Sequence, residues 1–200
     1  MDKYKVKNIA VFASGRGSNF SAIAKAVKAG KIKANLSLLV CDNPRAGVLK
    51  LAKAAGVKFV LAKKEEEIIL RLKEEKIDLV ILAGFMRILS ADFVRRYKNR
   101  ILNIHPSLLP SFKGAHAIKD AFDYGVKVTG VTVHFVDEKM DHGPIILQEA
   151  VKVDARGTLE SLEEKIHKVE HKIYPQAIQL YLTGRLKIEG RKVRVVAVPI

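Results

Sequence analysis

Short apolar runs alternate with stretches of helical periodicity along the first half of the chain. The runs with the character of buried strands are Lys7–Ala13, Leu36–Val40, Val57–Leu61, Leu79–Ala83 and Arg100–Ile104. Between them, Ser18 or Asn19 should cap a helix that runs to about Ala29, and further helical stretches run from Arg45 to Ala55 and from Lys64 to Glu75. Parallel strands need crossover connections of this kind. We therefore expect an α/β fold, Rossmann-like, with a doubly wound and mostly parallel sheet.

The second half adds extended runs and one long helix. Val128–Val136 alternates apolar and polar residues, and Pro144–Val153 is extended, so we expect an added strand pair. Thr158 should open a long helix that Pro175 kinks or restarts and Gly184 ends. Lys187–Val198 predicts a closing hairpin around Glu189-Gly190. Without a linker or repeat, residues 1–200 are expected to form a single domain.

A polar segment follows the last buried strand of the first half. It reads N-I-H-P-S-L-L-P-S-F-K from Asn103 to Lys113, and its prolines exclude a strand interior. Open α/β sheets bind ligands in loops at the carboxyl ends of their strands. Asn103 offers a hydrogen-bond donor and His105 a group that can carry a proton. A carboxylate from elsewhere in the chain, Asp141, could orient the imidazole, which together suits transfer of an acyl group to an amine.

A glycine-rich loop, S-G-R-G-S-N from Ser14 to Asn19, joins the first strand to its helix. Glycines let backbone amides approach an anion, and a helix N-terminus favours negative charge. The bland alternative is an ordinary tight turn. Phe20 stands where a dinucleotide fingerprint has its third glycine, although Asp42 is an acidic residue in the region of the second strand. The loop therefore favours one phosphate group over a pyrophosphate.

Four segments in this order resemble the phosphoribosylglycinamide formyltransferases, folate-dependent enzymes of purine biosynthesis. They are Ser14–Asn19, A-G-F-M-R-I-L at Ala83–Leu89, the Asn103 segment up to Gly114, and D-x-x-x-D-x-G-P-I from Asp137 to Ile145. The second and third recur in other formyltetrahydrofolate enzymes. The resemblance implies transfer of a formyl group from 10-formyltetrahydrofolate, a co-substrate, to 5-phosphoribosylglycinamide, and it suggests a cis Leu109-Pro110 bond.

The resemblance also assigns roles to residues. It makes Asn103, His105 and Asp141 catalytic. It places the substrate phosphate on Gly17, Ser18 and Asn19, and the glycinamide amine near Glu170, which sequence alone leaves as a solvated helix carboxylate. It places the folate on Asn103 and on Met86, Arg87, Ile88 and Leu89, with Lys64 as a basic position near the folate tail.

The other histidines and the lone cysteine carry no chemistry in this interpretation. His134 falls on the polar side of its strand, where we expect it to line the site. His167 and His171 are four apart on a helix, but no third ligand supports a metal site. Cys41 is expected to be a half-buried strand thiol, and a chain with one cysteine forms no internal disulfide. We expect no metal.

The net charge of +15 invites a nucleic-acid partner. The basic residues are spread along the chain and aromatic residues make up only 6%, so we expect small-molecule substrates and no nucleic acid. No apolar run approaches the roughly 20 residues that cross a bilayer, and no signal-peptide region is seen. We expect a cytoplasmic monomer or homodimer. The rivals are a methionyl-tRNA formyltransferase, a formyltetrahydrofolate deformylase and a basic RNA-binding module, which the chain's length and motifs disfavour.

Overall fold

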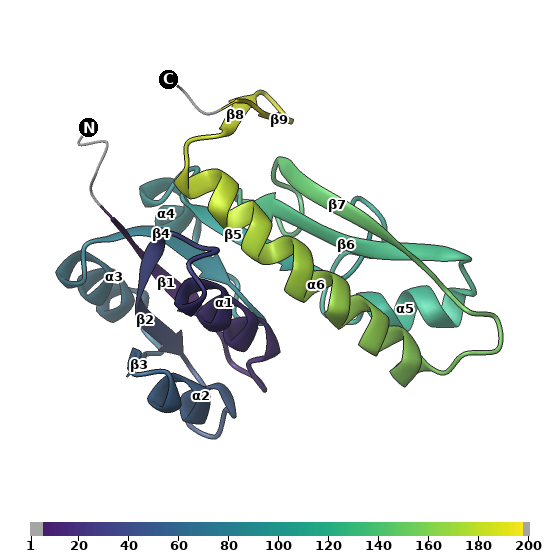
Figure 1. Cartoon of the computed structure of the whole chain (residues 1–200), viewed down its shortest axis with the longest axis horizontal. Coiled ribbons are helices and arrows are strands. Elements are labelled where there is room, and N and C mark those ends of the chain that lie inside the picture. Colours follow the sequence, from purple (N-terminus) through teal and green to yellow (C-terminus); the bar gives the residue numbers. More distant parts are fainter. Residues whose placement is uncertain (1–5, 198–200) are drawn as a thin grey trace. The chain divides into compact units, whose positions relative to one another are not determined.

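The chain divides after Leu102 into two units, unit 1 and unit 2. The structure is a computed structural model and describes residues 6–197 (Figure 1). Strand β5, Ile101–His105, runs across the division between the units.

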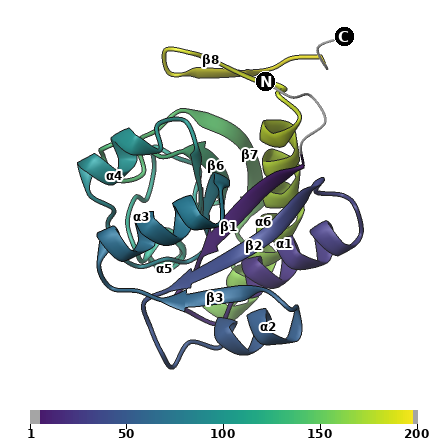
Figure 2. The same cartoon turned by 90° about the vertical axis from the view of Figure 1, so that its left-hand side faces the viewer.

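Unit 1 is built on four parallel strands in the order β3-β2-β1-β4. Their bounds are β1 Lys7–Phe12, β2 Ala34–Cys41, β3 Lys58–Leu61 and β4 Ile77–Leu82. The helices that join them are α1 Ser18–Lys28, α2 Val48–Ala54 and α3 Glu65–Glu74, and α4 Ala91–Arg96 follows β4. Figures 1 and 2 show α1 and α3 on opposite faces of the sheet. Helices on both faces explain why β1 is fully buried from Ile9 to Phe12.

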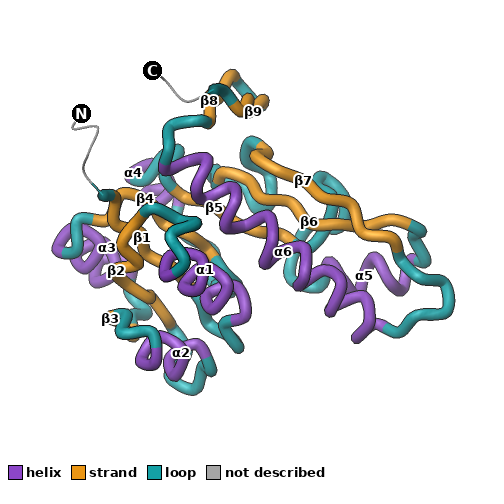
Figure 3. The backbone as a smooth tube through the Cα atoms, in the orientation of Figure 1, coloured by secondary structure: helices purple, strands orange, loops and turns teal. Residues whose placement is uncertain are grey.

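Unit 2 combines an antiparallel strand pair with a long helix. The pair is β6 Val128–Phe135 and β7 Ile145–Lys152, and α5 Ala117–Tyr124 precedes it. Helix α6, Leu159–Leu182, packs on β6, β7 and α5 (Figure 3). The hairpin of β8 Leu186–Glu189 and β9 Lys192–Val195 joins the pair where Lys192 of β9 meets Ile145 of β7.

The predicted α/β fold class is confirmed, with a mostly parallel sheet, antiparallel C-terminal strands and a long C-terminal helix. Three local predictions differ from the structure. The N-cap of α1 is Gly17, not Ser18 or Asn19. Helices α4 and α5 were not predicted. The predicted hairpin is present, although Val198 lies outside the described residues.

Pro175 does not restart α6, although the sequence predicts a kink or a restart at this residue. The helix is assigned as one element of 24 residues with Pro175 inside it. Tyr174 and Ala177, on either side of the proline, are fully buried, as is Ile178. Packing of this face against the rest of unit 2 offsets the backbone hydrogen bond that a proline cannot donate.

Thr158 begins α6 with a capping box. Its hydroxyl accepts a hydrogen bond from the Ser161 amide, and the Ser161 hydroxyl accepts one from the Thr158 amide, at 3.2 and 3.1 Å. Two of the amides that helices leave unpaired at their N-termini are thereby satisfied.

Replacing Thr158 with Ala should lower the free energy of unfolding by about 1 kcal/mol, because the cap acceptor is lost. Chemical denaturation would measure the change. Thr158→Ser keeps the hydroxyl and should stay close to the wild type. Equal stability of the Ala and Ser variants would show that the cap contributes nothing.

Candidate active site

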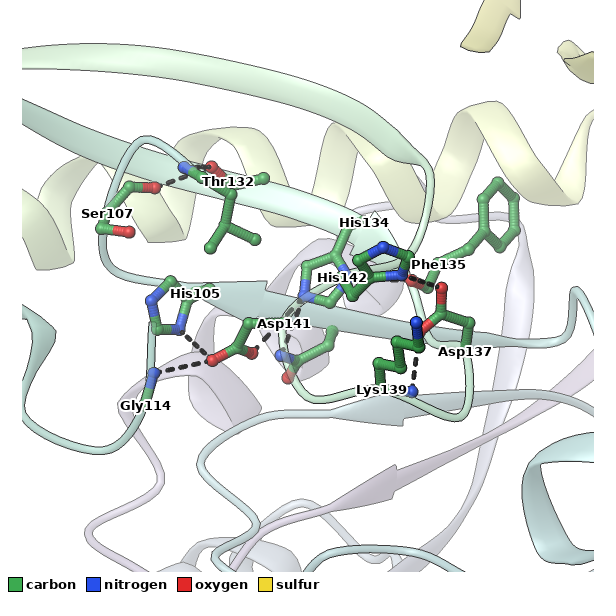
Figure 4. A network of polar contacts seen from close by, with 12 residues as sticks. His105, Ser107, Gly114, Thr132, His134, Phe135, Asp137, Lys139, Asp141 and His142 are labelled. Carbon is green, nitrogen blue, oxygen red and sulfur yellow. Dashed lines mark hydrogen bonds and ion pairs between the residues drawn. The ribbon is translucent and has the colours of Figure 1, made fainter. Parts of the chain in front are cut away.

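Two buried histidines and a half-buried amide lie close together in unit 2. Asn103 and His105 come from the end of β5 and His134 from the end of β6. His105 is 4% exposed and His134 is 2% exposed. Buried polar groups need hydrogen-bond partners, and Asp141 faces both imidazoles (Figure 4).

Both ring nitrogens of His105 have a defined partner. Nε2 lies 2.7 Å from the Phe112 carbonyl oxygen, and Nδ1 lies 3.4 Å from Asp141 Oδ2. A carbonyl oxygen only accepts, so Nε2 carries a hydrogen. When Nδ1 is protonated as well, the imidazolium donates to Phe112 and pairs with the carboxylate of Asp141.

Asp141 ties two loops together. Its Oδ2 accepts a hydrogen bond from the Gly114 amide at 2.9 Å, and its Oδ1 lies 3.9 Å from His134 Nε2. The residue has a φ of 48°, in the left-handed region that side chains other than glycine seldom adopt. Its neighbours therefore determine the backbone here, and they aim the carboxylate at the histidines.

His134 holds the amide of Asn103. Its Nδ1 donates to the Phe135 carbonyl oxygen at 2.7 Å, and its Nε2 lies 3.2 Å from Asn103 Nδ2. Burial lowers the pKa of His134, which outweighs the opposite effects of Phe135 and Asp141. A neutral imidazole with its hydrogen on Nδ1 accepts at Nε2, so Asn103 Nδ2 donates to it.

The alternation of β6 was misinterpreted. It was expected to place His134 on a polar side of the strand, yet Thr132 and His134 are as buried as Val131 and Val133. The signal available in the sequence is that Thr132 and His134 fall on one face of a strand that contains no Lys, Arg, Asp or Glu. Both faces of β6 are covered, and Thr132 and His134 each have hydrogen-bond partners, as buried polar groups usually do.

A hydrogen-bond clamp holds the loop that follows His105. The Thr132 hydroxyl donates to the Ser107 carbonyl at 2.7 Å and accepts from the Leu109 amide at 3.1 Å. Gln148 Nε2 donates to the Leu109 carbonyl at 3.0 Å, and the Leu109-Pro110 bond is cis. The loop is thus anchored to β6 and β7, and it presents Phe112 and Gly114 to the histidine and the carboxylate.

Gly143 closes the loop that carries Asp141. A Cβ at this position would lie 1.8 Å from the Phe135 carbonyl oxygen and 3.3 Å from the Asp137 amide. The two ends of the loop therefore approach each other more closely than any side chain would allow. Asp141 stands two residues before this constriction, which limits where the carboxylate can lie.

The predicted phosphate loop belongs to unit 1. Gly17 has a φ of 86°, and a Cβ there would lie 2.8 Å from Val48, so glycine is required on both grounds. Ser18, which is exposed, begins α1, and the first turn of the helix has no acidic residue. Asn19 is half-buried. Asp42, the acidic residue near the second strand that a dinucleotide site would use, accepts a hydrogen bond from the Ser14 hydroxyl.

The predicted folate segment also belongs to unit 1, in the loop after β4. Met86 and Ile88 are 69% and 82% exposed, which is unusual for large apolar side chains. Just past Leu89, Ser90 donates from its amide and its hydroxyl to the Glu65 carboxylate. Lys64 is exposed at the N-cap of α3, next to this anchor.

Glu170 is buried in α6, at 5% exposure, and not solvated as its sequence context had indicated. His167 Nδ1 lies 3.0 Å from its Oε2. Burial raises the pKa of the neighbouring Tyr174 well above its usual range, and the Glu170 carboxylate adds to this effect. A buried carboxylate is costly unless it is paired, and His167 is a partner of this one.

Unit 2 therefore brings Asn103, His105 and Asp141 together, as the sequence predicted, and adds His134. The remaining predicted residues of the phosphate and folate sites lie in unit 1.

Cys41 is fully buried instead of half-buried, and burial is the main cause that raises its pKa. Within residues 6–197 no group of three potential ligands is arranged to hold a metal ion, and no helix of that part is long and apolar enough to span a membrane.

Solved structures share this architecture. Glycinamide ribonucleotide transformylase 1 from Symbiobacterium toebii superimposes with a TM-score of 0.92 at 41% identity, covering 98% of this chain and 96% of that one. Phosphoribosylglycinamide formyltransferase from Anaplasma phagocytophilum gives 0.93 at 39% identity, covering 98% and 97%. The fold is that of a formyl-transferring class of enzymes.

The chain belongs to the formyl transferase family, whose family model matches residues 7–178. It is 46% identical over 186 residues to phosphoribosylglycinamide formyltransferase of Bacillus subtilis strain 168, covering 88% of this chain and 95% of that protein. It is 43% identical over 193 residues to the human trifunctional purine biosynthetic protein adenosine-3, covering 92% of this chain but 19% of that much longer protein.

Replacing Thr132 with Val should destabilise the protein by about 1–3 kcal/mol, because the buried Leu109 amide loses its acceptor. Thr129 of the same strand provides a matched control. Its hydroxyl is buried, and within the described part of the chain it has no hydrogen-bond partner. Thr129→Val should therefore be neutral or stabilising. Thermal or chemical unfolding of both variants measures the difference, and equal losses would contradict the clamp.

His134 should make stability depend on pH. The unfolded chain takes up a proton at this residue near the ordinary histidine pKa of 6.5, whereas the folded chain keeps it neutral to lower pH. Stability should therefore fall as the pH drops below about 6.5, by up to about 1.4 kcal/mol per pH unit from this residue. His134→Gln should flatten that slope in unfolding experiments between pH 7 and 5. An unchanged slope would contradict a neutral His134.

Proposed function

We propose that this protein transfers the formyl group of 10-formyltetrahydrofolate to the amine of 5-phosphoribosylglycinamide. The products are formylglycinamide ribonucleotide and tetrahydrofolate, as a step of purine biosynthesis. The family and the named relatives support an enzyme of this kind. The observation that carries the proposal is the convergence of Asn103, His105 and Asp141, with Nδ1 of His105 3.4 Å from the carboxylate.

The reaction passes through a tetrahedral intermediate. The substrate amine attacks the formyl carbon, and the formyl oxygen becomes an oxyanion that needs hydrogen-bond donors. The amide of Asn103 has two N–H groups, of which one faces His134 Nε2 at 3.2 Å. The second is available to the oxyanion, and one such donor contributes about 3–4 kcal/mol to the transition state.

His105 is the second proposed donor. Its Nε2 hydrogen is present before substrate binds, because it is donated to the Phe112 carbonyl oxygen at 2.7 Å. For this role the oxyanion has to replace the Phe112 carbonyl oxygen as the acceptor of that hydrogen. A positive imidazolium donates more strongly than a neutral ring, and the carboxylate of Asp141 beside Nδ1 stabilises that charge.

Proton transfer balances the reaction. The attacking amine loses one proton, and N10 of the departing folate gains one. His105, or a water held by His105 and Asp141, carries it between them. Holding the two substrates in line supplies a further part of the acceleration.

The binding residues are proposals of the same kind. Gly17, Ser18 and Asn19 present backbone amides at the start of α1, which suits the substrate phosphate. Met86 and Ile88 present exposed apolar side chains that suit the walls of a folate ring, while backbone groups of Arg87 and Leu89 read its edge. Glu170 suits the amine end of the substrate, and Lys64 the anionic folate tail.

The remaining expectations about the whole protein stay proposals. They are a single domain over residues 1–200, a monomer or homodimer, a cytoplasmic location and the absence of a nucleic-acid partner. Small-molecule substrates agree with the family.

The deciding experiment is a formyl-transfer assay with purified protein, 10-formyl folate and phosphoribosylglycinamide, each substrate being omitted in turn. Release of deformylated folate should require the ribonucleotide. His105→Ala and Asn103→Ala should each lower turnover at least about a hundredfold.

Three results would contradict parts of the proposal. Folate release without the ribonucleotide would indicate a deformylase. Near-normal turnover by His105→Ala would remove its role in proton transfer. No release with active folate would exclude this substrate and direct attention to other amines, and then to salt-sensitive RNA binding.

A further inference from the structure

Arg191 reaches from the C-terminal hairpin to the loop that carries Asp141. It stands in the turn between β8 and β9, outside the residues 7–178 that the family model matches. Its Nη2 donates to the His142 carbonyl oxygen at 2.7 Å, and its Nη1 lies 3.1 Å from His142 Nε2. The guanidinium of Arg191 thus contacts both the backbone and the ring of His142, the residue that follows Asp141.

The contact continues to the start of the loop. His142 Nδ1 lies 2.7 Å from Asp137 Oδ2, and Asp137 Oδ1 accepts from the Lys139 amide at 3.0 Å. A carboxylate only accepts, so Nδ1 of His142 carries the hydrogen that Asp137 receives. Nη1 of Arg191 lies 3.1 Å from Nε2 and 3.3 Å from Nδ1, so the guanidinium lies against the imidazole ring. Burial alone would raise the pKa of Asp137, but the bonds from His142 and Lys139 and the charge of Arg191 lower it. The three side chains are thus in contact in series, from guanidinium to imidazole to carboxylate.

These contacts lie next to Asp141, whose backbone conformation is constrained by its neighbours. Its φ of 48° is a conformation that its neighbours must impose. On one side the Gly114 amide binds its carboxylate. On the other, Arg191 binds His142, the next residue. A displacement of His142 would be transmitted directly to the carboxylate that faces His105.

We propose that Arg191 is a positioning residue for Asp141, acting through His142. The inference rests on the proposed function, since Asp141 is placed there in the chemistry. Among the described residues, Arg191 contacts His142 and neither His105 nor Asp141. It therefore acts by fixing the position of the Asp141 carboxylate. Loss of the guanidinium should leave substrate binding unchanged and slow the chemical step.

A purely structural role, anchoring the hairpin, is the competing explanation. The hairpin has another attachment that does not involve the Arg191 side chain, because Lys192 of β9 pairs with Ile145 of β7. Its two ends are also joined to each other, since Arg185 Nε donates to the Val196 carbonyl oxygen at 3.0 Å. Arg191 itself is exposed. Its removal should therefore leave the hairpin in place.

The test compares Arg191→Ala with Arg194→Ala in the full-length protein. Arg194 lies on the same hairpin and its removal costs the same charge, but its partner is Glu189 of the hairpin, at 3.1 Å. Arg191→Ala should lower kcat about tenfold, with KM for the ribonucleotide within about twofold of wild type, as expected for a misplaced catalytic group. Arg194→Ala should retain wild-type kcat. Arg191→Lys keeps the charge but cannot bind the carbonyl and the ring together, so its kcat should lie in between.

A double-mutant cycle tests the route. In a His142→Ala background, adding Arg191→Ala should lower kcat no further, because the group through which it acts is gone. Amide hydrogen exchange of residues 138–143, which needs no activity, should be faster in Arg191→Ala than in Arg194→Ala.

Two outcomes would overturn the inference: equal kcat for the two Arg variants, or losses that multiply in the His142→Ala background. Unchanged exchange of the loop would also count against it. Failure of the proposed function is distinguishable, because it would be seen as absent ribonucleotide-dependent turnover in the wild-type protein, whereas the exchange comparison would still report on the loop.

Discussion

Burial of the His105 imidazole is the constraint on which the candidate site depends. At 4% exposure neither ring nitrogen can rely on water, so each needs a partner from the chain. One partner is the Phe112 carbonyl and the other is Asp141, and these come from two separate loops. The bond from the Gly114 amide to Asp141 joins the loops to each other, and Thr132 fixes the first of them to β6. The same bonds that satisfy the imidazole thus set the geometry of the candidate site.

Much of this arrangement follows from local sequence. Buried parallel strands are continuously apolar, which made the strands of unit 1 recognisable, and glycines at strand ends marked the turns. Asn103 and His105 are predicted in a loop after the strand, but both lie on β5, and two residues apart on a strand they share one side. Asp141 is different. No local pattern links it to His105, and its assignment depended on resemblance to a family.

The features that were missed depend on contacts distant in sequence. The alternation on β6 predicts a polar side that carries His134, but both faces of the strand are buried. His134 is a hydrogen-bond partner of Asn103, which the sequence did not indicate. Helices α4 and α5 are too short to show a clear period, and the Ser90 cap of α4 was not recognised. The sequence predicts that Pro175 kinks or restarts α6, but the helix does not restart there, and the residues around the proline are buried. Arg191 is exposed and distant in sequence, so only the folded chain connects it with His142.

Gly143 shows that a residue without a side chain can tolerate substitution as poorly as a residue with a proposed chemical role, such as His105. Every replacement would put a carbon atom into the space of the Phe135 carbonyl oxygen. A survey of all single substitutions would therefore rank position 143 as intolerant as position 105. The two positions would still differ in kind. At position 105 a chemically similar side chain could restore part of the function, whereas at position 143 none could. A position at which every substitution fails therefore indicates a steric requirement on the backbone. A position at which a chemically similar residue restores part of the function indicates a chemical role.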